Sequence, residues 1–458
     1  MEPNASNGTG VRPAQLAAWS LVGVIGSMMI IPLNTVIPAF FAKHTAANIA
    51  TVGLVLMAAR LYDAFADPTI GFLSDRTRGR LGRRKPWLLA GAVLASISGY
   101  LLFNPRPDSG GVYLLFVCLA FYTAFSMLSV PHSAWGSELS RSYRERSMIS
   151  GMLTFAGVGG LLLFMGLPVL LSSPILPLFE TAEMTPPMLR LLGWLLVIAA
   201  PVCVIIPVLF TPAGEVRAVE RMSLRDLFAS MRSNRPFWLF VAAYVLNGLA
   251  YGVYYATTYM FLDSYMGLAD KFPLIYATGA FAQMLSIPVW TKLAQRFERH
   301  RIWALGIGAF GLLLPLRLLI PEGDLAFPLL MALVVVASFA NAASQVPQMA
   351  VLADCIDYGE LTTGKNLAGS YYAWQQFVLK AALAAGGGLA FFALAVVGFD
   401  AKTDLHSRSS LEGLSMVHTF GPLLLFVAAG ALVWIFPITR SRQTEIRMAL
   451  EARALANP

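Results

Sequence analysis

Residues 49–86 read IATVGLVLMAARLYDAFADPTIGFLSDRTRGRLGRRKP, an apolar stretch that carries a few charges and ends in a strongly basic loop. Its apolar part, 49–75, is longer than the roughly 20 residues that a helix needs to cross the hydrocarbon layer of a membrane. Six of the ten residues at 76–85 are Lys or Arg, which is typical of loops on the cytoplasmic side. The stretch therefore predicts a transmembrane helix that ends in the cytoplasm.

The composition of the whole chain agrees with a membrane protein. Of its 458 residues, 57% are apolar and only 13% are charged, whereas soluble domains have about 25% charged residues. This excludes a disordered or nucleic-acid-coating protein, and it argues against a soluble enzyme. The net charge of +8 is explained by basic cytoplasmic loops, so we expect no nucleic-acid partner.

The hydrophobic pattern predicts an all-α membrane protein with twelve transmembrane helices in two six-helix halves. Lys and Arg are distributed unevenly: 24 of the 33 lie in the tails and alternate loops that would share the cytoplasmic side with both termini. The predicted spans are 14–41, 49–75, 86–104, 111–139, 147–172, 187–211, 237–265, 271–295, 302–320, 325–357, 367–399 and 413–437.

A polar segment at 212–236 carries five Arg and divides the spans six and six. We therefore expect an N-terminal half at 1–211, a cytoplasmic linker at 212–236, a C-terminal half at 237–437 and a cytoplasmic tail at 438–458. Transporters are often built from two such repeats with the ligand site between them. In this sequence the evidence for a repeat is weak, since the basic loop at 76–85 has only a poorer counterpart at 292–301.

Three ionisable residues lie inside the span 49–75, where a charge is costly. Asp63 and Asp67 are four residues apart, and Arg60 comes three before Asp63, so a helix places all three on one face. Two carboxylates one turn apart repel each other in a dry site unless a cation, a basic group or a proton neutralises them. The pair indicates either the ion site of a cation-coupled transporter or a structural cluster in which Arg60 neutralises one carboxylate.

Lys380 lies in the middle of the span 367–399. Its charge needs a partner, and the carboxylates of the span 49–75 are the natural choice. A lysine there can compete with a cation for the acidic site. The alternative is that its side chain extends to the membrane surface, which a position near mid-span disfavours.

The basic loop at 76–85 has two interpretations. It is either only a signal for topology, or a gate in which arginines bind carboxylates and carbonyl groups at the ends of neighbouring helices. The residues that we expect in such a gate are Asp75, Arg76, Arg83, Asp354 and Asp357.

Three stretches, taken in order, resemble one known family. Residues 60–86, which begin Arg-x-x-Asp-x-x-x-Asp-Pro-x-x-Gly-x-x-x-Asp-Arg-Thr, resemble the second-helix signature of the glycoside–pentoside–hexuronide:cation symporters of the major facilitator superfamily. VPHSAWGSEL at 130–139 with YRER at 143–146 resembles the end of helix four and its loop. ADCIDYGE at 353–360, followed by Lys380, resembles helices ten and eleven.

The resemblance implies a cation site formed by Asp63 and Asp67, with Ser126 on the fourth span as a hydroxyl ligand and Lys380 as the family's helix-eleven lysine. Sugar-transporting members often have Asn just before the second aspartate, where this chain has Ala66. Because that ligand is missing, both Na⁺ and H⁺ remain open as the coupling cation. We expect no other cofactor.

The resemblance also implies positions for the substrate. Members of the family hold sugar with acidic residues on helices one and four and an arginine on helix five, and the matching positions here are Met28, Ser129 and Met152. Sugar hydroxyls need charged or amide partners in a dry pocket. A less polar or amphiphilic solute therefore fits this chain better than a galactoside.

Polar and aromatic residues recur at helical spacing in the C-terminal half. Such stripes either line a wet cavity or join neighbouring helices. For the span 325–357 both interpretations stay open, and for 237–265 and 367–399 the accompanying aromatic residues favour a cavity. The candidates for substrate binding are Asn247, Tyr251, Tyr254, Trp374 and Gln375.

These observations predict a secondary active transporter that moves a small organic solute, sugar-like or amphiphilic, by alternating access. The alternative is a non-transporting membrane sensor or scaffold with a transporter fold, against which the acidic pair and the basic loop argue. No catalytic triad, metal-ligand cluster or nucleotide motif is present in the sequence, so we expect no enzyme. We expect a monomer in a bacterial inner membrane, with the lipid bilayer and a small-molecule substrate as its partners.

Overall fold

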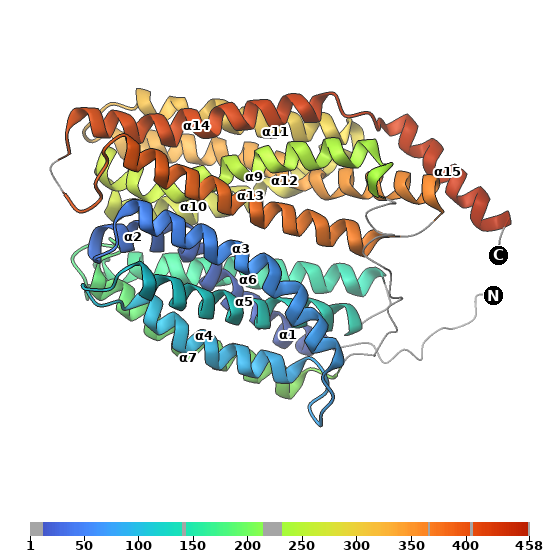
Figure 1. Cartoon of the computed structure of the whole chain (residues 1–458), viewed down its shortest axis with the longest axis horizontal. Helices are drawn as coiled ribbons and strands as arrows, with labels where there is room; N and C mark the ends of the chain where they lie inside the picture. The colour runs from blue at the N-terminus through green and yellow to red at the C-terminus, as the bar shows by residue number, and fades with distance from the viewer. Residues whose placement is uncertain (1–11, 140–142, 214–230, 365–366, 404–405, 457–458) are drawn as a thin grey trace. The chain divides into compact units, whose positions relative to one another are not determined.

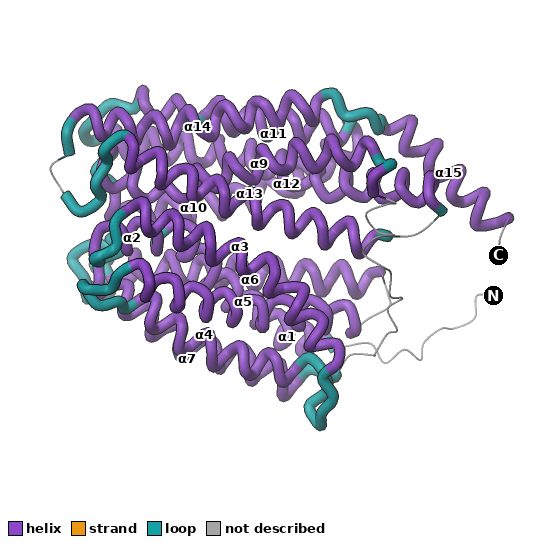
Figure 2. The backbone as a smooth tube through the Cα atoms, viewed as in Figure 1, coloured by secondary structure: helices purple, strands orange, loops and turns teal. Residues whose placement is uncertain are grey.

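The computed structural model of the chain describes residues 12–139, 143–213, 231–364, 367–403 and 406–456 (Figure 1). Within these ranges every regular element is a helix and there is no strand (Figure 2). Twelve helical segments are long and apolar enough to cross a membrane, which confirms the predicted fold class. Helices suit this role because they satisfy their backbone hydrogen bonds internally.

The elements of the N-terminal part are α1 (Pro13–Thr35), α2 (Ile37–His44), α3 (Ile49–Arg76), α4 (Lys85–Phe103), α5 (Gly111–Leu139), α6 (Tyr143–Leu171) and α7 (Pro186–Phe210). Those of the C-terminal part are α9 (Arg235–Met260), η1 (Phe261–Tyr265), η2 (Ala269–Lys271), α10 (Phe272–Arg296), α11 (Arg299–Leu313), η3 (Pro315–Leu319), α12 (Ala326–Thr363), α13 (Ala368–Val396), α14 (Arg408–Trp434) and α15 (Arg440–Ala456).

Many large apolar side chains on these helices are exposed. Phe155, Leu209 and Phe392 are 76%, 70% and 65% exposed. A water-soluble protein rarely presents so many large apolar groups together. The exposed surface is therefore suited to contact with lipid.

Two details differ from the sequence expectation. The predicted first span, 14–41, is broken at Val36 into α1 and α2, because Pro38 near the start of α2 has no N–H to continue the helical hydrogen bonds. The tail predicted at 438–458 contains the helix α15, whose polar sequence carries no signal for a membrane span.

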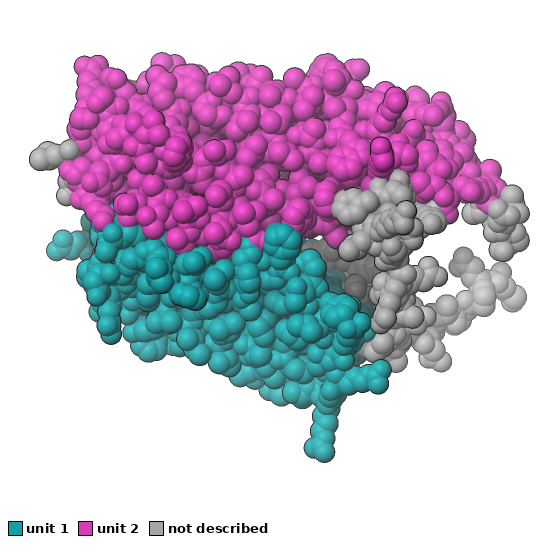
Figure 3. All heavy atoms as spheres, in the orientation of Figure 1, with its two compact units in different colours: residues 1–47, 62–219 teal, residues 48–61, 220–458 magenta. Residues whose placement is uncertain are grey.

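The chain divides into two compact units, which Figure 3 shows in different colours. Unit 1 consists of Met1–Ala47 and Tyr62–Val219, and unit 2 consists of Asn48–Leu61 and Glu220–Pro458. The border near 219 falls within the predicted linker at 212–236. Most of that linker lies outside the described residues, so its role stays a prediction.

The two units repeat the same packing of helices. In unit 1, the first spanning helix, α1, packs against the fifth and sixth, α6 and α7, and the third, α4, packs against α5 and α7. In unit 2, α9 packs against α13 and α14, and α11 packs against α12 and α14. These pairs occupy the same places in the order of helices, so the structure shows a repeat that the sequence only weakly indicated.

Glycines bring the backbones of the first and fifth helices of each unit into contact. A Cβ added at Gly160 of α6 would lie 2.2 Å from the carbonyl oxygen of Val24 in α1. A Cβ added at Gly386 of α13 would lie 2.2 Å from the carbonyl oxygen of Leu249 in α9. Small residues at helix crossings allow this close approach in membrane proteins.

We expect Gly386→Ala to destabilise the protein by about 1–3 kcal/mol, the usual cost of forcing an extra carbon into a filled space. The matched control is the adjacent Gly387→Ala, whose Cβ would meet its nearest atom at 3.7 Å and should leave stability close to that of the wild type. Thermal unfolding of the detergent-purified protein measures the difference. Equal unfolding temperatures for the two variants would contradict the close contact.

Candidate functional site

The structure places the predicted acidic pair and the predicted serine together inside unit 1. Ser126 of α5 donates a hydrogen bond to Asp63 Oδ1 at 2.9 Å and lies 2.5 Å from Asp67 Oδ1. Ser126 is fully buried and Asp63 is 3% exposed, while Asp67 is half-buried. Two carboxylates therefore converge on one hydroxyl inside the membrane-spanning part of the unit.

This arrangement follows from the helical repeat of α3. Asp63 and Asp67 are one turn apart, so both side chains leave the same face. α5 presents the small side chain of Ser126 to that face. The result is a compact set of oxygen atoms that can hold a proton or share a cation.

The described residues contain no group of three or more His, Cys, Asp or Glu side chains placed to hold a metal ion. The acidic pair and Ser126 together offer a cation two carboxylates and one hydroxyl. Arg60 lies on α3 three residues before Asp63, and Lys380 lies half-buried in the middle of α13. Their roles toward the acidic pair stay predictions.

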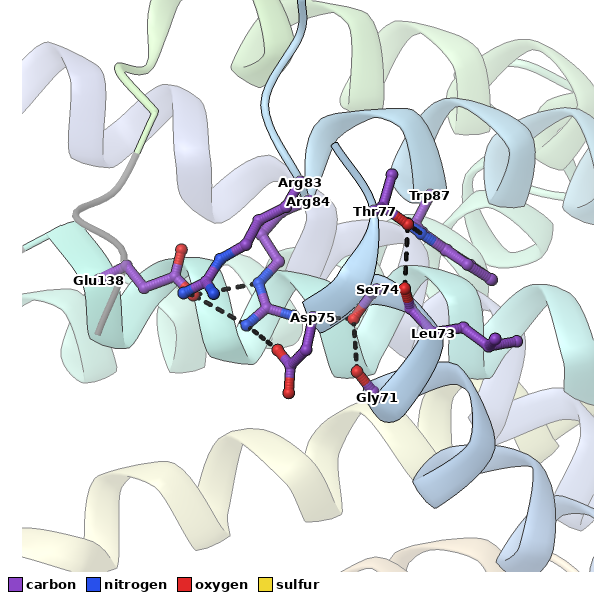
Figure 4. A network of polar contacts seen from close by, with 9 residues as sticks. All are labelled: Gly71, Leu73, Ser74, Asp75, Thr77, Arg83, Arg84, Trp87 and Glu138. Atoms are coloured by element: carbon purple, nitrogen blue, oxygen red, sulfur yellow. Dashed lines mark hydrogen bonds and ion pairs between the residues drawn. The ribbon is translucent and has the colours of Figure 1, made fainter. Parts of the chain in front are cut away.

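The loop after α3 forms a network of ion pairs and hydrogen bonds that we call the basic-loop network (Figure 4). Its members are Ser74, Asp75, Arg83, Arg84 and Glu138. Arg83 Nη2 donates to Glu138 Oε1 at 2.7 Å, and Arg84 donates to the same oxygen through Nε at 3.0 Å and Nη2 at 2.9 Å. Arg84 also lies 2.5 Å from Asp75 Oδ1 and donates to Ser74 Oγ at 2.7 Å.

Burial differs across this network. The side chains of Glu138 and Arg84 are 6% and 8% exposed, whereas that of Asp75 is 52% exposed. The strongest contacts therefore join the start of α4 to the end of α5, with Asp75 at the edge. Of the predicted gate residues, Arg76 instead lies over the ring of Phe72 at 3.6 Å.

A further contact of the same loop binds a neighbouring helix end through carbonyl groups. Lys85 Nζ donates to the carbonyl oxygens of Val208 and Thr211, each at 2.8 Å. These oxygens lie at the C-terminal end of α7, where a cation is favoured by the helix dipole. The loop thus holds helix ends through both carboxylates and carbonyls.

Each of the two gate residues predicted in unit 2, Asp354 and Asp357, has polar partners on another helix. Arg299 donates to Asp354 Oδ1 at 3.1 Å. Asp357 accepts a hydrogen bond from Gln443 at 3.3 Å and lies 3.5 Å from Arg447. Gln443 and Arg447 belong to α15, so the C-terminal helix is bound to the end of α12.

The predicted substrate residues lie in several environments. Met28 is fully buried in α1, whereas Ser129 of α5 and Met152 of α6 are half-buried. Tyr251 donates a hydrogen bond to Asn341 of α12, and Gln375 of α13 donates to Tyr244 of α9. These two residues join helices in the structure. Their part in substrate binding stays a prediction, as does that of Asn247 and Trp374.

A cavity of about 120 Å³ lies within unit 2 among α9, α10, α11, η3 and α12. Tyr254, one of the predicted substrate residues, lines it. Arg317 of η3, which is buried, also lines the cavity. We refer to it below as the Arg317 cavity.

Comparison with known proteins identifies the family to which the chain belongs. Residues 20–440 match the sequence profile of the MFS/sugar transport protein family. The chain belongs to this family. It is a membrane transporter and not an enzyme, in agreement with its twelve apolar helices and with its relatives.

Two bacterial symporters are among the relatives of this family member. The chain is 27% identical to the uncharacterized symporter YnaJ of Bacillus subtilis (strain 168), over 87% of this chain and 86% of YnaJ. It is 24% identical to the inner membrane symporter YicJ of Escherichia coli (strain K12), over 83% of this chain and 82% of YicJ.

Solved structures show the same fold. A mutant form of the nucleoside transporter NupG superposes with a TM-score of 0.66, over 92% of this chain and 99% of that chain. The sequence identity is 14%, so this likeness describes the architecture alone.

Two interacting pairs of residues in this MFS/sugar transport protein were not predicted from the sequence. Glu138 and Arg84 pair across 54 positions, and Arg317 and His418 across 101. Glu138 lies within the stretch 130–139 that resembles the known family, and this resemblance is the only feature of the sequence that could have marked Glu138 as important. Arg317 and His418 each appear singly at the end of, or inside, an apolar span, and only the packing of the helices brings them together.

Proposed function

We propose that this protein is a cation-coupled symporter that moves a small organic solute by alternating access. The observation that carries the proposal is the convergence of Asp63 and Asp67 on the hydroxyl of Ser126 inside a membrane-spanning helix. Carboxylates in such a place are costly, and in membrane proteins they commonly mark an ion pathway. The names of the symporter relatives support the same function.

We take a proton as the first candidate for the coupling cation. Ser126 lies within hydrogen-bonding distance of both carboxylates, so a proton taken up by the pair has a hydroxyl beside it that both donates and accepts. Ala66 supplies no side-chain oxygen for a sodium ion, which also favours a proton over sodium.

Neutralisation of the acidic pair would couple the cation to the solute. A proton or Na⁺ removes the repulsion between Asp63 and Asp67, and it thereby favours the conformation that binds solute. Lys380 supplies positive charge in the empty state and gives way when the cation enters. Arg60, on the same helical face, limits the repulsion while the site is empty.

We propose a bacterial inner membrane as the location, with both termini in the cytoplasm. The uneven distribution of Lys and Arg supports this orientation. Single cysteines placed at Gly79 and Glu322, both in exposed loops, test it by labelling in whole cells. Labelling of Glu322→Cys but not Gly79→Cys from outside is expected, and the opposite result would reverse the orientation.

The test of function is uptake into proteoliposomes that contain the purified full-length protein. A panel of neutral sugars, glucuronides and amphiphilic anions is offered under an imposed pH gradient, an imposed Na⁺ gradient or neither. We expect at least one solute to accumulate above its external concentration under the pH gradient. Accumulation under the Na⁺ gradient alone would assign Na⁺ as the coupling cation.

The alternative of a sensor or scaffold predicts a different outcome. Such a protein would bind a solute of the panel but show no uptake or exchange under any gradient. Counterflow of labelled solute in proteoliposomes without a gradient separates the two cases, because it requires transport but no coupling. Binding without counterflow would contradict the proposed function.

A further inference from the structure

The Arg317 cavity combines a buried cation with apolar walls. Arg317 is 5% exposed and projects from the short turn η3 into the cavity. Phe272, Ile275 and Leu330 form part of the apolar wall. Ligand sites typically have this character, with mostly apolar walls and a few polar groups that fix the orientation of the ligand.

The hydrogen bonds around Arg317 fix the state of its neighbour His418. Thr257 donates its hydroxyl hydrogen to the carbonyl oxygen of Val253 at 2.8 Å, so it acts as the acceptor toward His418 Nδ1, 2.8 Å away. With its hydrogen on Nδ1, His418 accepts from Arg317 Nη1 through Nε2 at 3.0 Å. The imidazole is therefore neutral and orients the guanidinium.

The charge of Arg317 is not balanced by an acid in the part of the chain that the structure describes. It contacts the neutral His418 and the hydroxyl of Tyr254, to which Nη2 donates at 3.0 Å, and its Cζ lies 5.3 Å from the centre of the Tyr254 ring. A guanidinium has five N–H groups, so three remain available after these two bonds. A buried charge is stable when it is paired and hydrogen-bonded, and an anionic ligand would complete both requirements.

We propose that the Arg317 cavity is a binding site for the carboxylate or phosphate group of a small amphiphilic solute. Arg317 binds the oxyanion through its free N–H groups, in the two-point geometry that guanidinium and carboxylate favour. Tyr254 and His418 hold the guanidinium in place. The apolar wall contacts the body of the solute. Taking this solute as the transported one rests on the proposed function.

The test is a binding measurement with the purified full-length protein and matched probes. Phenylacetate, phenyl phosphate and neutral 2-phenylethanol share one aromatic body, and dihexanoyl phosphatidic acid represents a lipid headgroup. We expect the anions to bind about tenfold or more tightly than the alcohol, as charge-assisted hydrogen bonds allow. Preference for the soluble anions assigns the site to a solute, and preference for the lipid assigns the same oxyanion chemistry to a headgroup.

Variants connect this preference to Arg317. Arg317→Gln should remove it, whereas the control Arg190→Gln, an exposed arginine bonded to Asn104, should retain it. If Arg317→Gln does not fold, Arg317→Lys serves instead, because it keeps the charge but loses the two-point contact and should weaken anion binding. Equal binding of anions and alcohol by the wild type, or an unchanged preference in the Arg317 variant, would overturn the proposal.

The binding measurement needs no gradient, so it is independent of the proposed function. Anion binding at Arg317 without gradient-driven uptake would leave this site standing and refute the symport. Gradient-driven uptake of neutral solutes, with no preference for anions in binding, would support the symport and refute the anion site at Arg317.

Discussion

Asp63→Asn and Asp67→Asn should each abolish gradient-driven accumulation of solute while exchange of solute across the membrane continues. Each variant replaces a carboxylate by an amide, which keeps a carbonyl oxygen but has no negative charge and takes up no proton. We expect the ratio of internal to external solute to fall about five- to 150-fold, to the value near one that is seen without a gradient. This range corresponds to a coupling free energy of about 1–3 kcal/mol. Uptake and counterflow in proteoliposomes measure accumulation and exchange separately.

Two further variants sharpen this result. Ser126→Ala removes the shared hydroxyl but keeps both carboxylates, so it should shift the pH at which uptake is half-maximal without abolishing it. Asp108→Asn changes an exposed aspartate in the loop before α5 and should behave like the wild type. If both Asp63→Asn and Asp67→Asn still concentrate solute against its gradient, the acidic pair is not the coupling site.

Glu138→Gln is expected to give the largest loss of stability, about 3–5 kcal/mol, because it removes the carboxylate that pairs with Arg83 and leaves the buried Arg84 to pair with the half-exposed Asp75. Arg83 and Arg84 both donate to one oxygen of Glu138. Thermal unfolding in detergent measures the loss. Asp75→Asn should cost less than about 1 kcal/mol, since Asp75 is half-exposed and exposed ion pairs contribute little.

The control for Glu138→Gln is Arg80→Gln in the same loop, where the side chain is exposed and the loss should be negligible. Combining Glu138→Gln with Arg83→Gln should recover part of the stability, because the second change removes the arginine charge that lost its carboxylate. A Glu138→Gln variant that unfolds at the wild-type temperature would show that the network is a topology signal only.

The sequence predicted the fold well because its main determinant is local. A run of about 20 apolar residues is sufficient to identify a spanning helix, and all twelve were found. The break at Val36 was missed although Pro38 stood in the sequence, because prolines also occur inside unbroken spans such as α3 and α12. α15 was missed because a polar helix has no hydrophobic run to reveal it.

The site was predicted as far as single helices determine it. Asp63 and Asp67 share a face through the helical repeat alone, and Ser126 was found only through the family resemblance. The partners of the basic loop could not be chosen from the sequence, since six cations compete for the same few carboxylates. Packing of α4 against α5 selects Arg83 and Arg84 for Glu138. Arg317 and His418 likewise meet only after η3 and α14 pack.

The glycine contacts of Gly160 with Val24 and of Gly386 with Leu249 limit how this transporter can move. Helices usually slide past each other by small shifts of the side chains between them. Where two backbones touch, no side chains lie between the helices to allow such shifts. We therefore expect the pair α1 and α6, and the pair α9 and α13, each to move as one rigid body. Spin labels placed across either pair would then report one narrow distance in every state of the transport cycle, while the changes in distance fall on other helices.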